Sequence, residues 1–422
     1  MSTAFSDHKK GILFISGVLG LMMIYSSVNA AEDVQALKNE IEILRQEMAE
    51  LRKLVKQQVQ QVRATNKQDM AKLRKDVAQT TDVHSEWKGA NSAVHLAGYG
   101  TVGYTDQESS DGSFNTLSFN PIFHYQYKDL FMLEAELEIE TEGDGGTAVE
   151  LEYASIDWLI NDYVALVAGK FLSPLGQFRQ NIHPGWVNKL ASAPPGFGHD
   201  GAAPLSELGV QLRGGYMFEN HMRTNYAFYV GNGPELESED GEVHGITAEA
   251  FRRDADGNPV WGGRVGFLPV ANFEIGVSGA TGKARVTTDE ALGLIASDPA
   301  RSYSAFGVDM VYTRKALNLR YEYIRQRVAN KSASVIAPMG GTWRAWYAQA
   351  AYRFPSTKWE AVARYTDYNS PHAGQEQEQV AAGVNYWFAG NAVAKVTYES
   401  NSGLSGTTTD RDRFLVQLSY GF

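Results

Sequence analysis

The chain has 422 residues, carries a formal net charge of −11 and contains no cysteine. The acidic balance argues against a nucleic-acid partner, because phosphates need a basic face. Without cysteine there are no disulfides and no thiolate metal sites, so stability must come from a large hydrogen-bonded scaffold. Aromatic residues form 11% of the chain and glycine 41 of its 422 residues, which suits long strands and interfacial aromatic girdles.

Residues 1–30 have the order of a cleavable signal peptide. His8, Lys9 and Lys10 precede an uncharged apolar run over 11–25, and Val28-Asn29-Ala30 follows it. The run is shorter than the roughly 20 residues that span a bilayer. We therefore expect cleavage after Ala30, with a retained signal anchor as the alternative.

Residues 31–79 carry a heptad pattern, and residues 80–92 read as a linker. Apolar residues recur in alternating steps of three and four, at Val34, Leu37, Ile41, Leu44, Met48, Leu51 and Val55. Gln58 interrupts the stripe, as a stutter does. The narrow stripe favours an α-helical coiled coil, and the alternative is one amphipathic helix lying on its own barrel. The pattern does not decide between dimer and trimer.

Residues 93–422 change to an apolar period of two, which indicates strands. A soluble sandwich would also alternate, so the lengths of the links decide. Links after even-numbered strands are short and those after odd-numbered strands are longer, as in an outer-membrane barrel with short periplasmic turns. The fold class is therefore an all-β transmembrane barrel of about 16 antiparallel strands, closed because lipid cannot pair an open edge. We expect the strands at 94–104, 115–128, 130–141, 149–160, 163–171, 208–218, 223–231, 260–269, 273–282, 303–313, 317–326, 343–354, 359–366, 379–388, 392–400 and 413–422.

The last strand alternates apolar and polar residues and ends in Phe422. A terminal aromatic residue on such a strand resembles the signal that the barrel assembly machinery recognises. Outward-facing residues of every strand are expected to contact outer-membrane lipid.

Enzyme motifs are absent from this pattern. Gly98-Tyr99-Gly100-Thr101-Val102-Gly103 matches a dinucleotide fingerprint, but no helix is predicted after it, so the match is rejected. Among the histidines only His124 lies centrally in a predicted strand, while His183, His199 and His244 fall in loops, where we expect solvation. Because no nucleophile motif or metal-ligand spacing appears, we expect neither enzyme, cofactor nor metal.

The longest link, residues 172–207, is the candidate for an inward-folding constriction. It combines Pro, Gly and aromatic residues with few charges, and links of this length are usually functional or disordered. Its constriction candidates are Arg179, His183, Trp186 and Lys189. A surface cap or trimer contact is the alternative.

Two sets of charged residues are predicted to line the pore, where their balance would set charge selectivity. The basic set, which would guide anions, consists of Lys170, Arg213, Arg264, Arg320, Arg353, Arg364 and Lys395. The acidic row consists of Glu134, Glu136, Glu138 and Glu140. Charges of opposite sign across the lumen would produce a transverse field, and ordinary lumen hydration without selectivity is the alternative.

The segment from Ala168 to Gly176, following Leu151 to Asp157, resembles the phosphate-selective porin O/P family and its relatives. The resemblance covers about 94–422 and implies a trimeric sixteen-stranded porin for small hydrophilic solutes, with phosphate as the first solute that the family suggests. Because the long link offers only Arg179 and Lys189 as cations, a general porin is preferred, with anion preference as an option. A dedicated receptor or porin for a siderophore or dicarboxylate is the other reading, since the acidic loop 232–259 could bind a cationic ligand unless it is simply solvated. The expected location is the outer membrane, with the coiled coil in the periplasm.

Overall fold

The computed structural model describes Lys53 and residues 92–141, 145–198, 201–202, 204–247, 254 and 256–422. The predicted signal peptide, coiled coil and linker lie outside the described residues, apart from Lys53 and Ser92. In the described ranges, no helix is long and apolar enough to cross a lipid bilayer.

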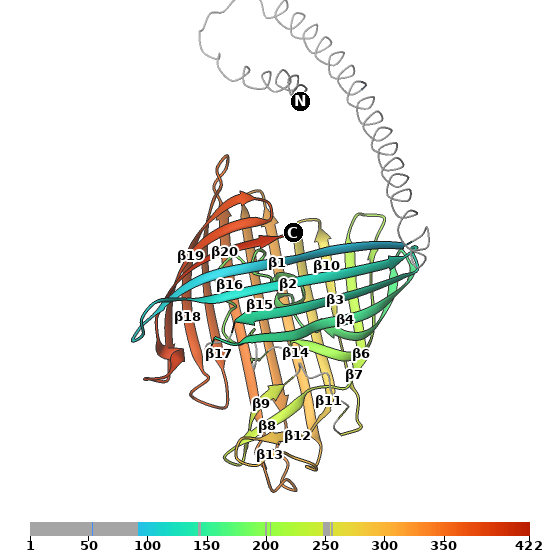
Figure 1. Cartoon of the computed structure of the whole chain (residues 1–422). Coiled ribbons are helices and arrows are strands. Elements are labelled where there is room, and N and C mark those ends of the chain that lie inside the picture. The colour runs from blue at the N-terminus through green and yellow to red at the C-terminus, as the bar shows by residue number, and fades with distance from the viewer. Residues whose placement is uncertain are drawn as a thin grey trace, which may run out of the picture. The chain divides into compact units, whose positions relative to one another are not determined.

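Sixteen antiparallel strands of the described residues form one closed barrel, as predicted (Figure 1). The barrel closes where β1 pairs with β20, from Tyr99 opposite Gly421 to Gln107 opposite Arg413. The strands are β1 Ser92–Gln107, β2 Ser113–Tyr127, β3 Phe131–Thr141, β4 Thr147–Asn161, β5 Val164–Leu172, β6 Ser206–Met217, β7 Arg223–Gly231, β10 Val260–Val270, β11 Phe273–Ala284, β14 Arg301–Arg314, β15 Leu317–Val328, β16 Gly341–Arg353, β17 Trp359–Asn369, β18 Gln377–Ala389, β19 Ala392–Gly403 and β20 Arg413–Gly421.

Alternation along each strand separates an apolar outer face from a more polar inner face. In β20, Val416, Leu418 and Tyr420 are exposed, whereas Gln417 and Ser419 are buried. Successive side chains of a strand point to opposite faces, so one sequence satisfies both surroundings. Such an outward apolar surface suits lipid, and the inward face holds hydrogen-bonding groups.

Gly98 lies where the two ends of the barrel meet. Its N–H donates to the Phe422 carbonyl at 3.1 Å, and the Phe422 N–H donates back at 2.9 Å. A Cβ at this position would lie 2.5 Å from the Asn120 carbonyl oxygen and 2.8 Å from the Phe422 ring. A glycine at this position therefore lets the backbone of β1 approach its neighbouring strands closely. Because β1 continues as a strand from Ser92 to Gln107, the rejection of a dinucleotide fingerprint is consistent with the fold.

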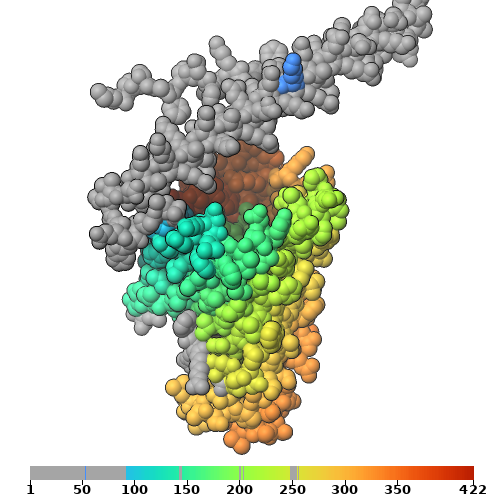
Figure 2. Space-filling model, turned by 90° about the vertical axis from the view of Figure 1, so that its right-hand side faces the viewer, coloured from blue at the N-terminus to red at the C-terminus, as the bar shows by residue number. Residues whose placement is uncertain are grey.

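The long links at one end of the barrel fold into a second sheet that the sequence analysis did not predict (Figure 1). This small sheet consists of β8 Glu235–Glu239, β9 Glu242–Thr247, β12 Val286–Asp289 and β13 Gly293–Leu294, in the order β13-β12-β8-β9. The alternative of a simply solvated loop over 232–259 therefore does not hold for residues 235–247, most of which lie in β8 and β9. The barrel strands next to the small sheet along the chain are β7, β10, β11 and β14, and they belong to the side of the barrel that Figure 2 shows in green to orange.

The small sheet has a local sequence signal. Asp240 and Gly241 join β8 to β9 with positive φ angles of 49° and 82°, as a two-residue hairpin requires. Leu236 and Val243, on either side of this turn, are completely buried. An Asp-Gly pair flanked by alternating residues is a recognised hairpin signal. The acidic composition of the segment instead suggested a solvated loop, so the hairpin was not predicted.

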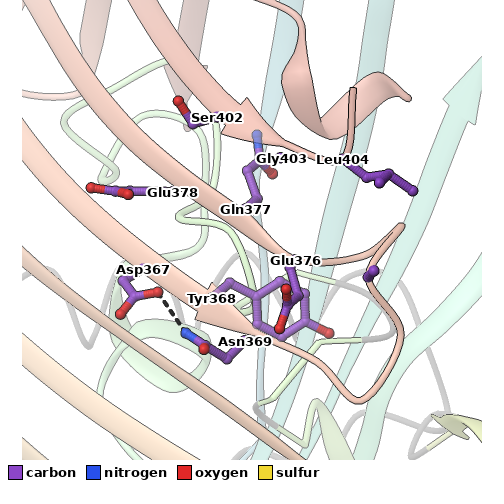
Figure 3. Close-up of a pocket in the computed structure, with 10 residues that line it drawn as sticks. Asp367, Tyr368, Asn369, Glu376, Gln377, Glu378, Ser402, Gly403 and Leu404 are labelled. Atoms are coloured by element: carbon purple, nitrogen blue, oxygen red, sulfur yellow. Dashed lines mark hydrogen bonds between the residues drawn. The ribbon is translucent and has the colours of Figure 1, made fainter. Parts of the chain in front are cut away.

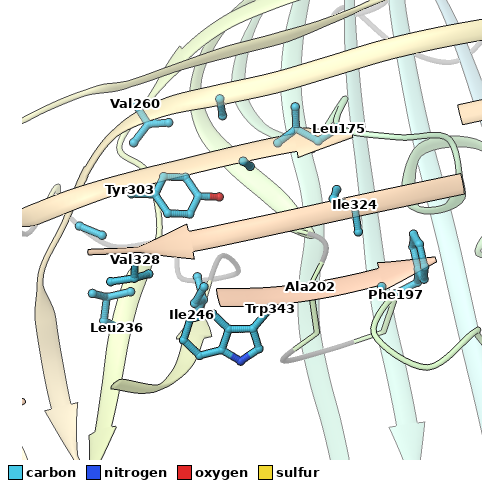
Figure 4. Close-up of a cluster of buried hydrophobic side chains, with 14 of the residues drawn as sticks. Leu175, Phe197, Ala202, Leu236, Ile246, Val260, Tyr303, Ile324, Val328 and Trp343 are labelled. Carbon is cyan, nitrogen blue, oxygen red and sulfur yellow. The ribbon is translucent and has the colours of Figure 1, made fainter. Parts of the chain in front are cut away.

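A single apolar cluster joins the small sheet, the barrel wall and the longest link (Figure 4). It contains Leu236 of the small sheet, Ile324 and Trp343 of the wall, and Leu175 and Phe197 of the link. All five side chains are at most 2% exposed. The barrel therefore has an internal core on one side, and this core positions the link.

Candidate functional site in the barrel lumen

The link between β5 and β6 is described at residues 173–198, 201–202 and 204–205, and these residues lie against the inner wall of the barrel; we call them the inner link. The π-helix η1 Phe178–Ile182 begins with two backbone N–H groups, those of its N-cap and of its first residue, that donate to one carboxylate. The N–H of Gln177 donates to Glu322 at 3.1 Å, and the N–H of Phe178 donates to its other oxygen at 3.0 Å. Glu322 lies on β15, so the link reaches well across the barrel from β5.

Two inward cations of the basic set hold the second half of the inner link. Arg364 donates to the carbonyls of Ser192 at 3.1 Å and Ala193 at 3.2 Å. Lys395 donates to the Leu190 carbonyl at 3.2 Å and also to the Gly185 carbonyl. These two residues were predicted to face solutes, and in the structure their donors are directed at link backbone. A buried carbonyl without a donor is costly, which explains cations at these positions.

Both cations of the inner link are paired with wall carboxylates. Arg179 forms an ion pair with Glu152 on β4. Lys189 lies 3.0 Å from Glu360 on β17 and 4.8 Å from the Trp387 ring centroid. Each of these two side chains already has a carboxylate partner, so neither is arranged to bind a solute anion on its own.

The other two constriction candidates contact the seam of the barrel. His183 Nε2 lies 3.4 Å from the Tyr99 hydroxyl and 3.8 Å from Glu152. A Cβ on Gly421 would lie 2.8 Å from the Trp186 ring, so this ring packs on β20. The inner link therefore has polar contacts with β4, β15, β17 and β19 and ring contacts with β1 and β20.

The inward cations away from the inner link also have partners. Arg213 pairs with Asp157, and Arg264 lies 2.6 Å from Asp309 and 2.9 Å from Glu274. Arg320 donates to Asn318 at 3.1 Å, and the Arg353 guanidinium lies 5.1 Å from the Trp387 ring centroid. The predicted basic set is therefore largely engaged by the wall itself.

Lys170 has the opposite strand phase to Val167, yet its side chain is buried, with 7% exposed. It pairs with Ala154 and Leu208, whereas Val167, three residues earlier, pairs with the buried Asp157. Two residues separated by an odd number in a strand point to opposite faces. The Lys170 ammonium donates to the Leu151 carbonyl at 2.7 Å. Lys170 is therefore bound to the wall itself, like the other basic residues, and its place in the pore stays a prediction.

The acidic row of β3 lies on the inward phase, as its alternation with the exposed Phe131 and Leu133 shows. Glu134 lies 3.4 Å from His124 and 3.8 Å from Arg213, and Glu138 is paired across the strands with Glu150. In the closed order, β3 is third and β15 is eleventh of sixteen, so the two stand opposite each other. Arg320 lies on this opposite wall, on the same strand phase as Glu322.

Two hollows with mixed polar and apolar linings mark the two ends of the wall. One, of about 380 Å³, lies near the short turn after β4 and is lined by Arg213, Arg264, Asn225 and Gln180 among others. The other, also about 380 Å³, lies among the long links, and Figure 3 shows Asp367, Glu376 and Glu378 around it. Among the described residues, no group of three or more His, Cys, Asp or Glu side chains is arranged to hold a metal ion.

A closed sixteen-stranded barrel with an apolar outer face and a polar inner face crossed by one long link is the architecture of an outer-membrane channel. Residues 88–404 match the Gram-negative porin family. The chain belongs to this family, and it is a channel protein rather than an enzyme. A comparison with curated proteins found no match.

Solved porin structures share the fold at low sequence identity. The anion-selective porin from Comamonas acidovorans is 12% identical with a TM-score of 0.52, covering 78% of this chain and 100% of that one. OmpF of Salmonella typhi in complex with daunomycin is 14% identical with a TM-score of 0.51, covering 79% and 98%. The outer membrane channel DcaP of Acinetobacter baumannii is 11% identical with a TM-score of 0.50, covering 79% and 99%.

Proposed function

We propose that the protein is a general porin that passes small hydrophilic solutes passively, with the inner link as its constriction. The main support for this proposal is the set of hydrogen bonds between the inner link and the inner wall, above all those of Glu322, Arg364 and Lys395. A sixteen-stranded barrel is wide enough for an aqueous channel, and a link fixed inside it narrows that channel.

The charges support weak selectivity rather than a phosphate filter. Phosphate recognition uses arginine forks that are free to bind, whereas Arg179 and Arg264 already pair with carboxylates. The acidic row on β3, on the wall opposite the strand that carries Arg320, instead supports a transverse field with a mild preference for cations. The phosphate-selective O/P resemblance, with its anion preference, is the alternative.

Conductance in a planar bilayer tests this proposal. The protein should open stepwise under a KCl gradient, and replacing residues 177–192 by a Gly-Ser segment of equal length should raise the unitary conductance. A silent folded barrel would overturn the open-porin proposal, and block by millimolar phosphate would favour the phosphate-selective alternative.

Charge reversal inside the lumen tests the selectivity. Glu138→Lys should shift the zero-current potential toward anions, and Arg320→Glu should shift it toward cations. Glu219→Lys carries the same charge change on a short turn outside the barrel strands and serves as the matched control. Equal shifts in Glu138→Lys and Glu219→Lys would contradict the assignment of the acidic row to the pore.

Three further expectations rest on the resemblance and the sequence pattern. We propose a homotrimer, export by the signal peptide with a periplasmic coiled coil, and recognition of the strand ending in Phe422 by the barrel assembly machinery. Chemical crosslinking in native membranes measures the first, and it should give a ladder that ends at three chains.

A further inference from the structure

Two histidines far apart in the sequence are adjacent on the inner wall near the short-turn end. His95 of β1 is paired across the strands with His124 of β2. Their Nδ1 atoms lie 3.5 Å apart, and their rings are stacked with centroids separated by 5.6 Å. Both are inward, because the flanking Leu96 and Phe123 are exposed on the outer face. We call them the histidine pair.

A carboxylate supports the histidine pair from the next strand. Glu134 of β3 is paired with His124, and its Oε1 lies 3.4 Å from His124 Nε2. The Nδ1 atom of His124 thus faces His95 while its other ring nitrogen faces a carboxylate. Metal-binding histidines commonly have this arrangement, in which the carboxylate fixes the ring and raises its basicity.

We propose that the histidine pair binds a divalent first-row transition ion such as Zn²⁺ or Cu²⁺. Two imidazole nitrogens that bind one tetrahedral ion at about 2.0–2.1 Å are roughly 3.3–3.4 Å apart. The Nδ1 atoms already stand 3.5 Å apart. Imidazole is a preferred ligand of both ions.

The site supplies two protein ligands and leaves the remaining positions to water. The stacked rings must turn about χ2 before both lone pairs point at one ion, and this torsion is broad for histidine. His95 is exposed, so its ring has room to turn. The simpler arrangement is a hydrogen bond between two neutral rings without metal affinity, and the experiment below separates the two.

A bound dication would change the electrostatics of the pore wall. It would place two positive charges beside Glu134, at the end of the acidic row. Under the proposed porin function, on which this consequence rests, metal binding shifts the zero-current potential toward anions. Binding itself does not depend on that function.

Calorimetric titration of the purified full-length protein with Zn²⁺ measures the site directly. We expect His95→Ala and His124→Ala each to weaken the affinity at least tenfold, and Glu134→Gln to weaken it by about 10- to 100-fold. His221→Asn changes a lone histidine on a short turn and should leave the affinity unchanged. Equal affinities in wild type and His95→Ala would overturn the proposal.

Electron paramagnetic resonance with Cu²⁺ adds a structural readout. The wild-type spectrum should show coupling to two nitrogen ligands, and His95→Ala should lose one of them. Spectra that are identical in the two proteins would overturn the site. Gel mobility before and after heating shows that each variant forms the barrel.

Bilayer recordings with Zn²⁺ then separate the site from its consequence. A shift toward anions that is absent in His95→Ala supports both. Zn²⁺ binding without any shift overturns the effect on selectivity and leaves the site standing. A channel that never conducts overturns the porin function, while calorimetry still decides the site.

Discussion

Glu322 is the anchor that fixes the start of the inner link, and its replacement by Gln tests how the constriction is held. The carboxylate accepts the N–H groups of Gln177 and Phe178 and, at 3.3 Å, the hydroxyl of Tyr347. Glutamine keeps one acceptor oxygen and turns an NH₂ group toward the other donors. At least one buried N–H then loses its acceptor.

A buried donor left without an acceptor costs about 1–3 kcal/mol. If opening of the link start requires only this anchor to break, the opened fraction rises roughly 5- to 150-fold, because about 1.4 kcal/mol is a factor of ten. The distal bonds through Arg364 and Lys395 remain, so we expect brief local opening rather than release of the whole link.

Thiol labelling measures this opening cleanly because the chain has no cysteine. Ser173 is completely buried at the start of the inner link, so Ser173→Cys is protected while the link is in place. Its reaction with a maleimide should accelerate in Glu322→Gln by the factor above. Glu138→Gln makes the same change on the opposite wall and should leave the rate unchanged. An unchanged rate in Glu322→Gln would refute the anchor.

Three further changes test other parts of the structure. Gly98→Ala should lower the yield of heat-modifiable barrel several-fold, because the new Cβ would lie 2.5 Å from a backbone oxygen. Gly100→Ala, whose nearest such contact would be 3.5 Å, should fold normally. Equal yields of the two variants would contradict the close packing at the junction of β1 and β20. Leu236→Asp buries a carboxylate in the small sheet at a cost of several kcal/mol, so a protease should cut within 232–247 while the barrel stays intact, and continued resistance would argue against the sheet. The Tyr398 hydroxyl and the Asn401 N–H hold the pKa of Asp412 below its usual value. This contribution is therefore present above the unfolded pKa of about 3.9 and is lost as the pH falls through the folded pKa, so exchange protection of the Asn401 amide should persist from pH 7 to 5 and be reduced at every pH in Asp412→Asn.

Strand number and the faces of most strands could be predicted from the sequence, because alternation is a local property of extended chain. Phe131 and Leu133 alternate with the acidic row, and the structure has them on opposite faces. Phase was harder to assign at Lys170, which has the opposite phase to Val167 and is nevertheless buried. The hairpin at Asp240-Gly241 was not predicted, because its signal lay within an acidic stretch.

The path of the inner link was not predictable in detail, because its partners are remote in the sequence. The N–H of Gln177 binds a carboxylate 145 residues away, and Lys189 pairs with a carboxylate 171 residues away. Composition indicated a packed link but could not select among the many inward carboxylates. Barrel closure and strand tilt decide which of them come within reach.

The histidine pair shows the same division. The sequence by itself put His124 in the middle of a strand and fixed the alternation that turns it inward. It showed no metal-ligand spacing, since His95 lies 29 residues earlier. Only the register between β1 and β2, set by the hydrogen-bonded closure of the sheet, brings the two rings together. The alternation of side chains depends only on neighbouring residues in the chain, whereas register and long-range pairing depend on the closed sheet as a whole.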